Sequence, residues 1–201
     1  MSYSEGYRIR DPSKPHFLTL TVVGWLDVFT RYCYRDLLLD NLGYCILNKG
    51  MILYGYVIMS NHVHLIVQAE NGLLSELLRD FKKHTSKIIL RAIKDEPESR
   101  RDWMISYFSE ACKTHSRNEH YQFWKYGNHP EEIYSTKFLW SKLDYIHLNP
   151  VRARIVKRAS EYIYSSASNY VNGEGIISVS LAANPVIDVH KKDAFWKSIS
   201  W

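Results

Sequence analysis

Residues 51–69 constrain the fold more than any other segment, because they contain two short apolar runs separated only by Ser60-Asn61. The runs MILYGYVIM and HVHLIVQA are as long as strands and are rich in the β-branched and aromatic residues that suit a pleated surface. A two-residue break between two such runs predicts a tight antiparallel turn. The chain therefore contains a predicted hairpin that any fold must accommodate.

The second strand of this hairpin begins with two histidines, His62 and His64. Residues i and i+2 of a strand point to the same face, so the two imidazoles project together. The residues that alternate with them are all apolar and would fill the opposite face: Val63, Leu65 and Val67. One face of the strand is predicted to pack in the core. The other face carries the two histidines at its start and is a candidate functional site.

Strands and helices are also predicted on either side of the hairpin. Residues 16–29 predict a strand broken at Gly24, and YQFWKYG at 121–127 is a candidate fourth strand. Helices are expected over 35–49, 73–94 and from 136 to a stop at Pro150, with a loop at 95–102 and an otherwise irregular section over 108–135. The order βαββα predicts an α+β fold, a ferredoxin-like antiparallel sheet with helices packed on one face, plus a C-terminal extension.

The composition excludes several classes of protein. The 201 residues are enough for one domain with a substantial core. No apolar run approaches the roughly 20 residues that cross a bilayer, and the first residues lack the apolar core of a signal peptide. The three cysteines form no CxxC pair. We therefore expect a cytoplasmic protein without a membrane partner.

Two neutral imidazoles on one strand face can bind a divalent cation if another element supplies a third ligand. Tyr145 and Asn149 are four residues apart in a predicted helix, so they share one face and could hold a phenol and an amide oxygen above the same metal. The alternatives are two half-exposed histidines, a half-buried tyrosine and an asparagine at a helix end. His147 is two residues from Tyr145, so the helical spacing places it on a different face of the helix.

The net charge of +5 is mild, but basic residues cluster in the predicted second helix and after Pro150. Such clusters can follow a phosphate backbone, although a basic helix can equally be a solvated face. The candidate DNA contacts are Arg79, Lys82, Lys83, Lys87, Arg91 and Arg152. Trp124 and Tyr126 could stack on unpaired bases or could pack in the core.

A zinc hydrolase is a further alternative, in which His62 and His64 would combine with ligands from CKTHSRNEH. That segment offers Cys112, His115 and His120, but their spacing matches no known zinc pattern.

The ordered set HFLTLTVVG, MSNHVHLIV and DYIHLNPVRA, followed by YSSASNY, resembles the REP-associated tyrosine transposase group of the HUH endonuclease superfamily. The resemblance spans about residues 16–170. It implies a transposase domain over residues 1–170 and an extension of unknown role over 171–201. Arg154 stands where many relatives are expected to have glycine. This difference affects the turn after the helix and leaves the chemistry unchanged.

The resemblance also implies the chemistry. His62 and His64 would bind Mg²⁺ or Mn²⁺, Asn149 would be a third ligand, and Tyr145 would attack single-stranded DNA near a palindromic hairpin through a 5′-phosphotyrosine intermediate. Strand transfer would need no ATP, because the phosphotyrosine conserves the bond energy. A homodimer could form in which one subunit's tyrosine helix completes the other's site. The alternative function is a non-catalytic module of the same fold that binds single-stranded nucleic acid.

Overall fold

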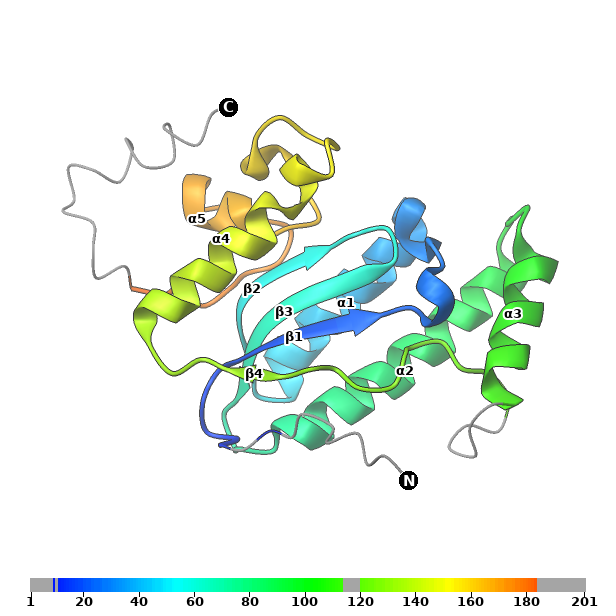
Figure 1. Ribbon diagram of the computed structural model, residues 1–201, viewed down its shortest axis with the longest axis horizontal. Coiled ribbons are helices and arrows are strands. Elements are labelled where there is room, and N and C mark those ends of the chain that lie inside the picture. Colours follow the sequence, from blue (N-terminus) through cyan, green and yellow to red (C-terminus); the bar gives the residue numbers. More distant parts are fainter. Residues whose placement is uncertain (1–8, 10, 114–119, 184–201) are drawn as a thin grey trace, which may run out of the picture.

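A computed structural model describes residue 9 and residues 11–113 and 120–183 (Figure 1). Its main element is a four-stranded antiparallel sheet in the order β2-β3-β1-β4. The strands are β1 (His16–Thr21), β2 (Met51–Ile58), β3 (His62–Ala69) and β4 (Glu131–Glu132). The helices are α1 (Tyr32–Asn48), α2 (Leu74–Asp95), α3 (Arg101–Lys113), α4 (Thr136–Arg152) and α5 (Ala167–Asn172), with short 3₁₀ turns at Val23–Trp25, Val28–Thr30 and Ala159–Glu161.

The register of the sheet places the two histidines of β3 directly opposite residues of β1. In the β1–β3 ladder, Thr19 pairs with His64 and Thr21 pairs with His62, so these four side chains lie on the same face. The predicted hairpin is confirmed: β3 spans the predicted residues, and β2 ends one residue early, at Ile58.

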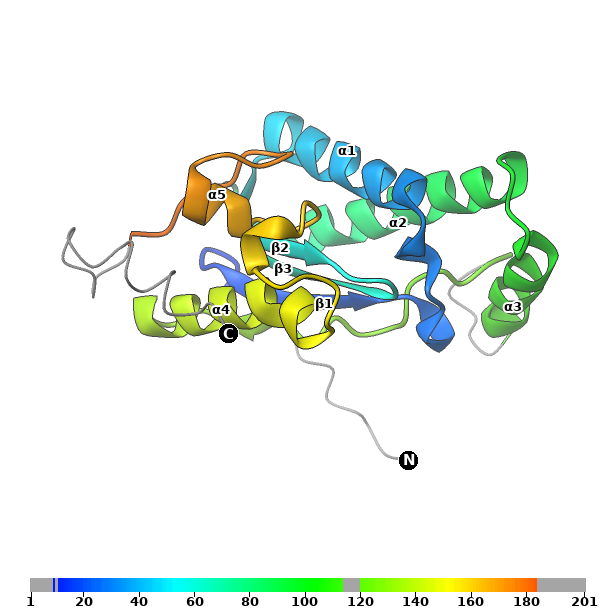
Figure 2. The ribbon, with the colours of Figure 1, turned by 90° about the horizontal axis from the view of Figure 1, so that it is seen from above.

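The α+β fold class is confirmed, with one difference in how the helices are layered. Helices α1 and α2 cover one face of the sheet, and α4 covers the opposite face (Figure 2). Helix α4 approaches β2 at Gly55, where a Cβ would lie 2.6 Å from Leu143 and 3.0 Å from Ile146. The sheet is therefore buried on both faces over part of its area. The face that carries His62 and His64 is the one that α4 covers.

Three local predictions are wrong. Residues 101–113 form helix α3, which buries Met104, Phe108 and Cys112 at four-residue intervals. Segment 121–127 is not a strand, because only Trp124 bridges to Val22, and the fourth strand is β4. Helix α4 passes through Pro150 and ends at Arg152, because a proline in the last turn removes only one backbone donor.

The described C-terminal segment continues from α5 and packs beside β2. The Ser180 amide donates to the Leu53 carbonyl at 2.8 Å, and the Trp140 indole donates to the Ala183 carbonyl at 3.2 Å. Helix α5 runs across residue 170, and the boundary there stays a prediction. Within the described ranges, no helix combines the length and apolar character needed to cross a membrane.

Candidate active site

His62 and His64 lie at the start of β3 with their ring centroids 4.7 Å apart. His64 is buried, and its Nδ1 hydrogen-bonds with the Thr19 hydroxyl at 2.9 Å. His62 Nδ1 lies 2.7 Å from Oδ1 of Asn61, where the ring N–H donates. These contacts fix both ring orientations and direct the two Nε2 atoms away from the hydrogen-bonded side, as metal-ligating histidines require.

Both imidazoles are neutral at neutral pH. Burial lowers the pKa of His64 to about 3, with smaller contributions from the charges of His62 and Lys142. Burial also lowers the pKa of His62. Only the neutral ring has a lone pair for a metal ion, so the two side chains are held in the form that binds a cation.

Helix α4 brings Tyr145 against the histidines. The Tyr145 ring is edge-on to the His64 ring, with centroids 5.3 Å apart, and edge-on to Phe17 at 5.9 Å. The guanidinium of Arg152 lies 5.7 Å from the Tyr145 ring centroid. Tyr145 is nevertheless 42% exposed, so its ring is positioned by contacts on one side while a substrate can approach from the other.

Asn149 lies one turn after Tyr145, as the four-residue spacing predicts. Its Nδ2 donates to the Tyr145 carbonyl at 3.4 Å, and no hydrogen bond in the described part of the chain joins it to His62 or His64. His147 is fully buried and hydrogen-bonds through Nε2 to the Ser166 hydroxyl at 2.8 Å. His147 is therefore turned away from the site, as predicted.

The donor set fits a hard divalent cation. The two Nε2 atoms have no hydrogen-bond partner among the described residues, and an amide oxygen is available on the tyrosine helix. No group of three or more His, Cys, Asp and Glu side chains is placed for metal binding in the described ranges. Of the alternative zinc ligands, Cys112 is buried on α3, His120 is exposed, and His115 lies outside the described residues.

Sequence reasoning missed three residues around this site. Thr19 orients His64 through the cross-strand pair. Asp144 precedes the tyrosine and has a buried carboxylate oxygen without a hydrogen-bond partner, and burial raises its pKa. Trp25, with its ring centroid 6.1 Å from that of His62, is 60% exposed. The pairing of β1 with β3 would have predicted Thr19 opposite His64. The positions of Asp144 and Trp25 depend on tertiary packing.

The predicted DNA contacts fall in two places. Arg152 lies beside Tyr145, but the other five lie on α2, in the layer on the opposite side of the sheet (Figure 2). Lys82 is directed inward, where its ammonium donates to the Asn128 side chain at 2.8 Å and the Lys125 carbonyl at 3.2 Å. Arg79 and Arg91 pair with Asp80 and Asp95 in exposed ion pairs.

Of the two aromatic residues predicted to stack on bases, Trp124 packs in the core. It is 4% exposed, and its indole N–H donates to the Thr85 hydroxyl at 3.0 Å. Tyr126 is partly buried in the segment that follows.

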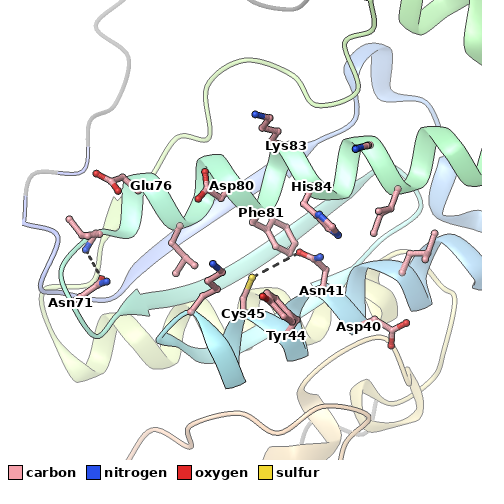
Figure 3. A pocket seen from close by; sticks show the side chains of 16 residues that line it. Asp40, Asn41, Tyr44, Cys45, Asn71, Glu76, Asp80, Phe81, Lys83 and His84 are labelled. Carbon is pink, nitrogen blue, oxygen red and sulfur yellow. Dashed lines mark hydrogen bonds between the residues drawn. The ribbon is translucent and has the colours of Figure 1, made fainter.

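A concave region with a volume of about 930 Å³ lies between α1 and α2 (Figure 3). Cys45 and Phe81 line it together with residues of both charges, such as Asp40, Asp80 and Lys83. It is separated from His62 and His64 by the sheet, so it is not part of the histidine–tyrosine site.

Comparisons with known proteins find one matching family model and one solved structure of similar fold. Residues 27–123 match the family described as "Transposase IS200 like", a range that includes both histidines and ends before Tyr145. A solved structure of a REP-associated tyrosine transposase bound to a REP hairpin shares the fold, with a TM-score of 0.58 and 18% sequence identity over 94% of this chain and 96% of that one. No curated protein sequence matches the chain. The family match and the shared fold confirm the resemblance to the REP-associated tyrosine transposase group that the sequence motifs indicate.

Proposed function

We propose that this chain is a metal-dependent DNA transposase that cleaves and rejoins single-stranded DNA next to a hairpin, with Tyr145 as the nucleophile. The observation that carries the proposal is the 5.3 Å approach of the Tyr145 ring to His64, two residues from separate elements that the chain brings together. A half-exposed tyrosine beside paired neutral histidines places a nucleophile next to two potential metal ligands, which supports attack on a phosphodiester.

His62, His64 and Asn149 would hold the cation, either Mg²⁺ or Mn²⁺. A divalent cation at this position would polarise the scissile phosphate and offset the charge that develops on it. The contacts of Thr19 and Asn61 with the two rings keep the ligand nitrogens oriented before any metal binds. Asn149 is the less direct assignment, because its contact is with the tyrosine backbone.

Tyr145 performs the covalent step. Its phenolic oxygen, after losing its proton, attacks the phosphorus, and the bond from phosphorus to the 3′ oxygen breaks. The departing oxygen takes up a proton and becomes a 3′-OH, while the 5′ side stays on the enzyme as a phosphotyrosine. Attack by the same or another 3′-OH reverses the step and regenerates the phenol. The Arg152 guanidinium lies 5.7 Å from the Tyr145 ring centroid, so a cation stands beside the tyrosine.

The substrate class follows from access and from the related structure. The tyrosine and the histidines must both reach one phosphate, which is easier on an unpaired strand than within a duplex. The structural relative is bound to a REP hairpin, which supports a hairpin with unpaired flanks as the DNA partner here. Arg152 is the candidate phosphate contact at the site.

The decisive experiment uses hairpin DNA labelled at the 5′ or the 3′ end, with and without Mn²⁺. We expect a denaturation-resistant protein–DNA adduct on the 5′-phosphate side that requires the metal. Tyr145→Phe and His64→Ala should form none. Tyr44→Ala, which alters an exposed tyrosine on α1, is the matched control and should react as the wild type does.

Two results would contradict the proposal. Equal cleavage by the wild type and Tyr145→Phe would exclude Tyr145 as the nucleophile. Tight hairpin binding without any adduct in Mn²⁺ or Mg²⁺ would favour the non-catalytic binding module instead.

A further inference from the structure

A row of exposed aromatic side chains begins at the His62 ring and leads away from the active site. It consists of Trp25, in the 3₁₀ turn after β1, and Tyr107 and Trp103, on α3. Their exposed fractions are 60%, 39% and 55%. Figure 1 shows the turn after β1 between the end of the sheet and α3. We call these three residues the aromatic row.

The backbone at Trp25 is in an unfavourable conformation. Its φ is +58°, in the left-handed region that tryptophan rarely adopts, and the preceding Gly24 has a φ of +66°. The Trp25 carbonyl accepts a hydrogen bond from the Asn61 side chain at 3.3 Å, which ties the turn to the residue before His62. An exposed indole gains little from packing, so packing does not offset this strain. Strain of this kind is typical of ligand-binding positions.

Two ring contacts and one contact with Gly24 connect the row from His62 to α3. The Trp25 and His62 ring centroids are 6.1 Å apart, with the rings edge-on. Tyr107 packs directly on Gly24, where its ring and hydroxyl occupy the space that any Cβ would need. Trp103 lies one helical turn from Tyr107, with ring centroids 6.4 Å apart. Glycine at position 24 therefore allows α3 to dock against the turn that carries Trp25.

We infer that the aromatic row binds the unpaired nucleotides that flank the scissile phosphate, with one base stacked on Trp25 and the next bases on Tyr107 or Trp103. This inference rests on the proposed function, because His62 and Tyr145 define where the phosphate lies. Aromatic side chains bind single strands by stacking, and a duplex does not expose base faces to them. Lys125 is exposed and bonded through its amide to the Thr21 carbonyl at 2.8 Å, so a cation also lies at this end of β1.

The test measures binding to two fluorescent probes in the absence of divalent metal, so that cleavage plays no part. One probe is a blunt hairpin, and the other is the same hairpin with unpaired 5′ and 3′ flanks. We expect Trp25→Ala and Trp103→Ala each to weaken binding of the flanked hairpin roughly tenfold, with little change for the blunt hairpin. Tyr44→Ala, of similar exposure but on α1, should change neither.

An abasic nucleotide in the flank provides the second measurement. Trp25→Ala should lose its effect on a probe whose stacking base has been removed, because the two changes delete the same contact. Unchanged binding of the flanked probe by both variants, or equal weakening of both probes, would overturn the inference. A wild-type protein that forms no adduct while the flank-specific loss persists would instead contradict the proposed chemistry and leave the aromatic row in place.

Discussion

The ring of Tyr145 meets the ring of His64 edge-on within a single chain, with centroids 5.3 Å apart and planes inclined at 71°. The proposed nucleophile and the proposed metal-binding pair therefore lie side by side within one chain. A second copy is not needed to bring them together, although the sequence resemblance leaves a shared site open.

Mixing two inactive variants tests this arrangement. If each site takes its tyrosine and its histidines from the same chain, neither variant can repair the other. A mixture of His64→Ala and Tyr145→Phe should therefore form no adduct with hairpin DNA. The measurement is the adduct yield on a denaturing gel after the two proteins have been unfolded and refolded together. Partial recovery of the adduct would show that the tyrosine helix of one subunit serves the histidines of another.

Thr19→Val should weaken metal binding. The hydroxyl of Thr19 holds Nδ1 of His64 at 2.9 Å, and loss of such a supporting contact typically costs about 10- to 100-fold in metal affinity. Calorimetric titration with Mn²⁺ measures the change. Thr21→Val is the matched control, because Thr21 pairs with His62 on the same face but makes no hydrogen bond to a ring in the described part of the chain. Equal losses in both variants would assign no special role to Thr19.

Arg152→Ala should weaken hairpin binding more than Arg91→Ala does. Arg152 lies 5.7 Å from the Tyr145 ring, whereas Arg91 pairs with Asp95 on the opposite layer. Loss of one phosphate contact should also reduce the slope of log affinity against log salt concentration by about 1. Anisotropy titrations over a range of salt concentrations measure both quantities. A larger effect at Arg91 would move the DNA path to α2.

Arg154→Gly should stabilise the fold by about 0.5–1 kcal/mol. Arg154 has a φ of +58°, which costs an L-residue about 1 kcal/mol or more, and the greater unfolded-state entropy of glycine offsets part of the gain. Urea unfolding measures the difference. Arg158→Gly is the control, because its φ of −124° is ordinary and glycine there should give no stabilisation.

Lys82 should make stability depend on alkaline pH. Burial lowers the pKa of its ammonium from 10.5 to about 8. Between these two values the unfolded chain binds a proton that the folded chain does not, so the free energy of unfolding should rise with pH. Lys82→Met should remove this increase, measured by urea unfolding at pH 7.5 and 9.5. Lys83→Met, on the exposed side of α2, should keep it.

Local patterns predicted much of the fold. The hairpin, helix α1 and helix α2 follow from the alternation of apolar residues and from their recurrence along one helix face, signals that depend only on neighbours in the chain. Helix α3 carried a similar signal in Met104, Phe108 and Cys112, but the charged residues around them masked it. The failure at 121–127 has another cause, because Phe123 and Trp124 are apolar to fill the core beside Phe29 rather than to pair in a sheet.

The sequence by itself determined that His62 and His64 share a strand face and that Tyr145 and Asn149 share a helix face. Each of these depends on a fixed local period. Only the tertiary structure decided that α4 packs on the histidine face, that Lys82 points inward and that Trp25 stands beside His62. Those relationships depend on which apolar faces bury each other between distant segments, and no local period encodes that pairing.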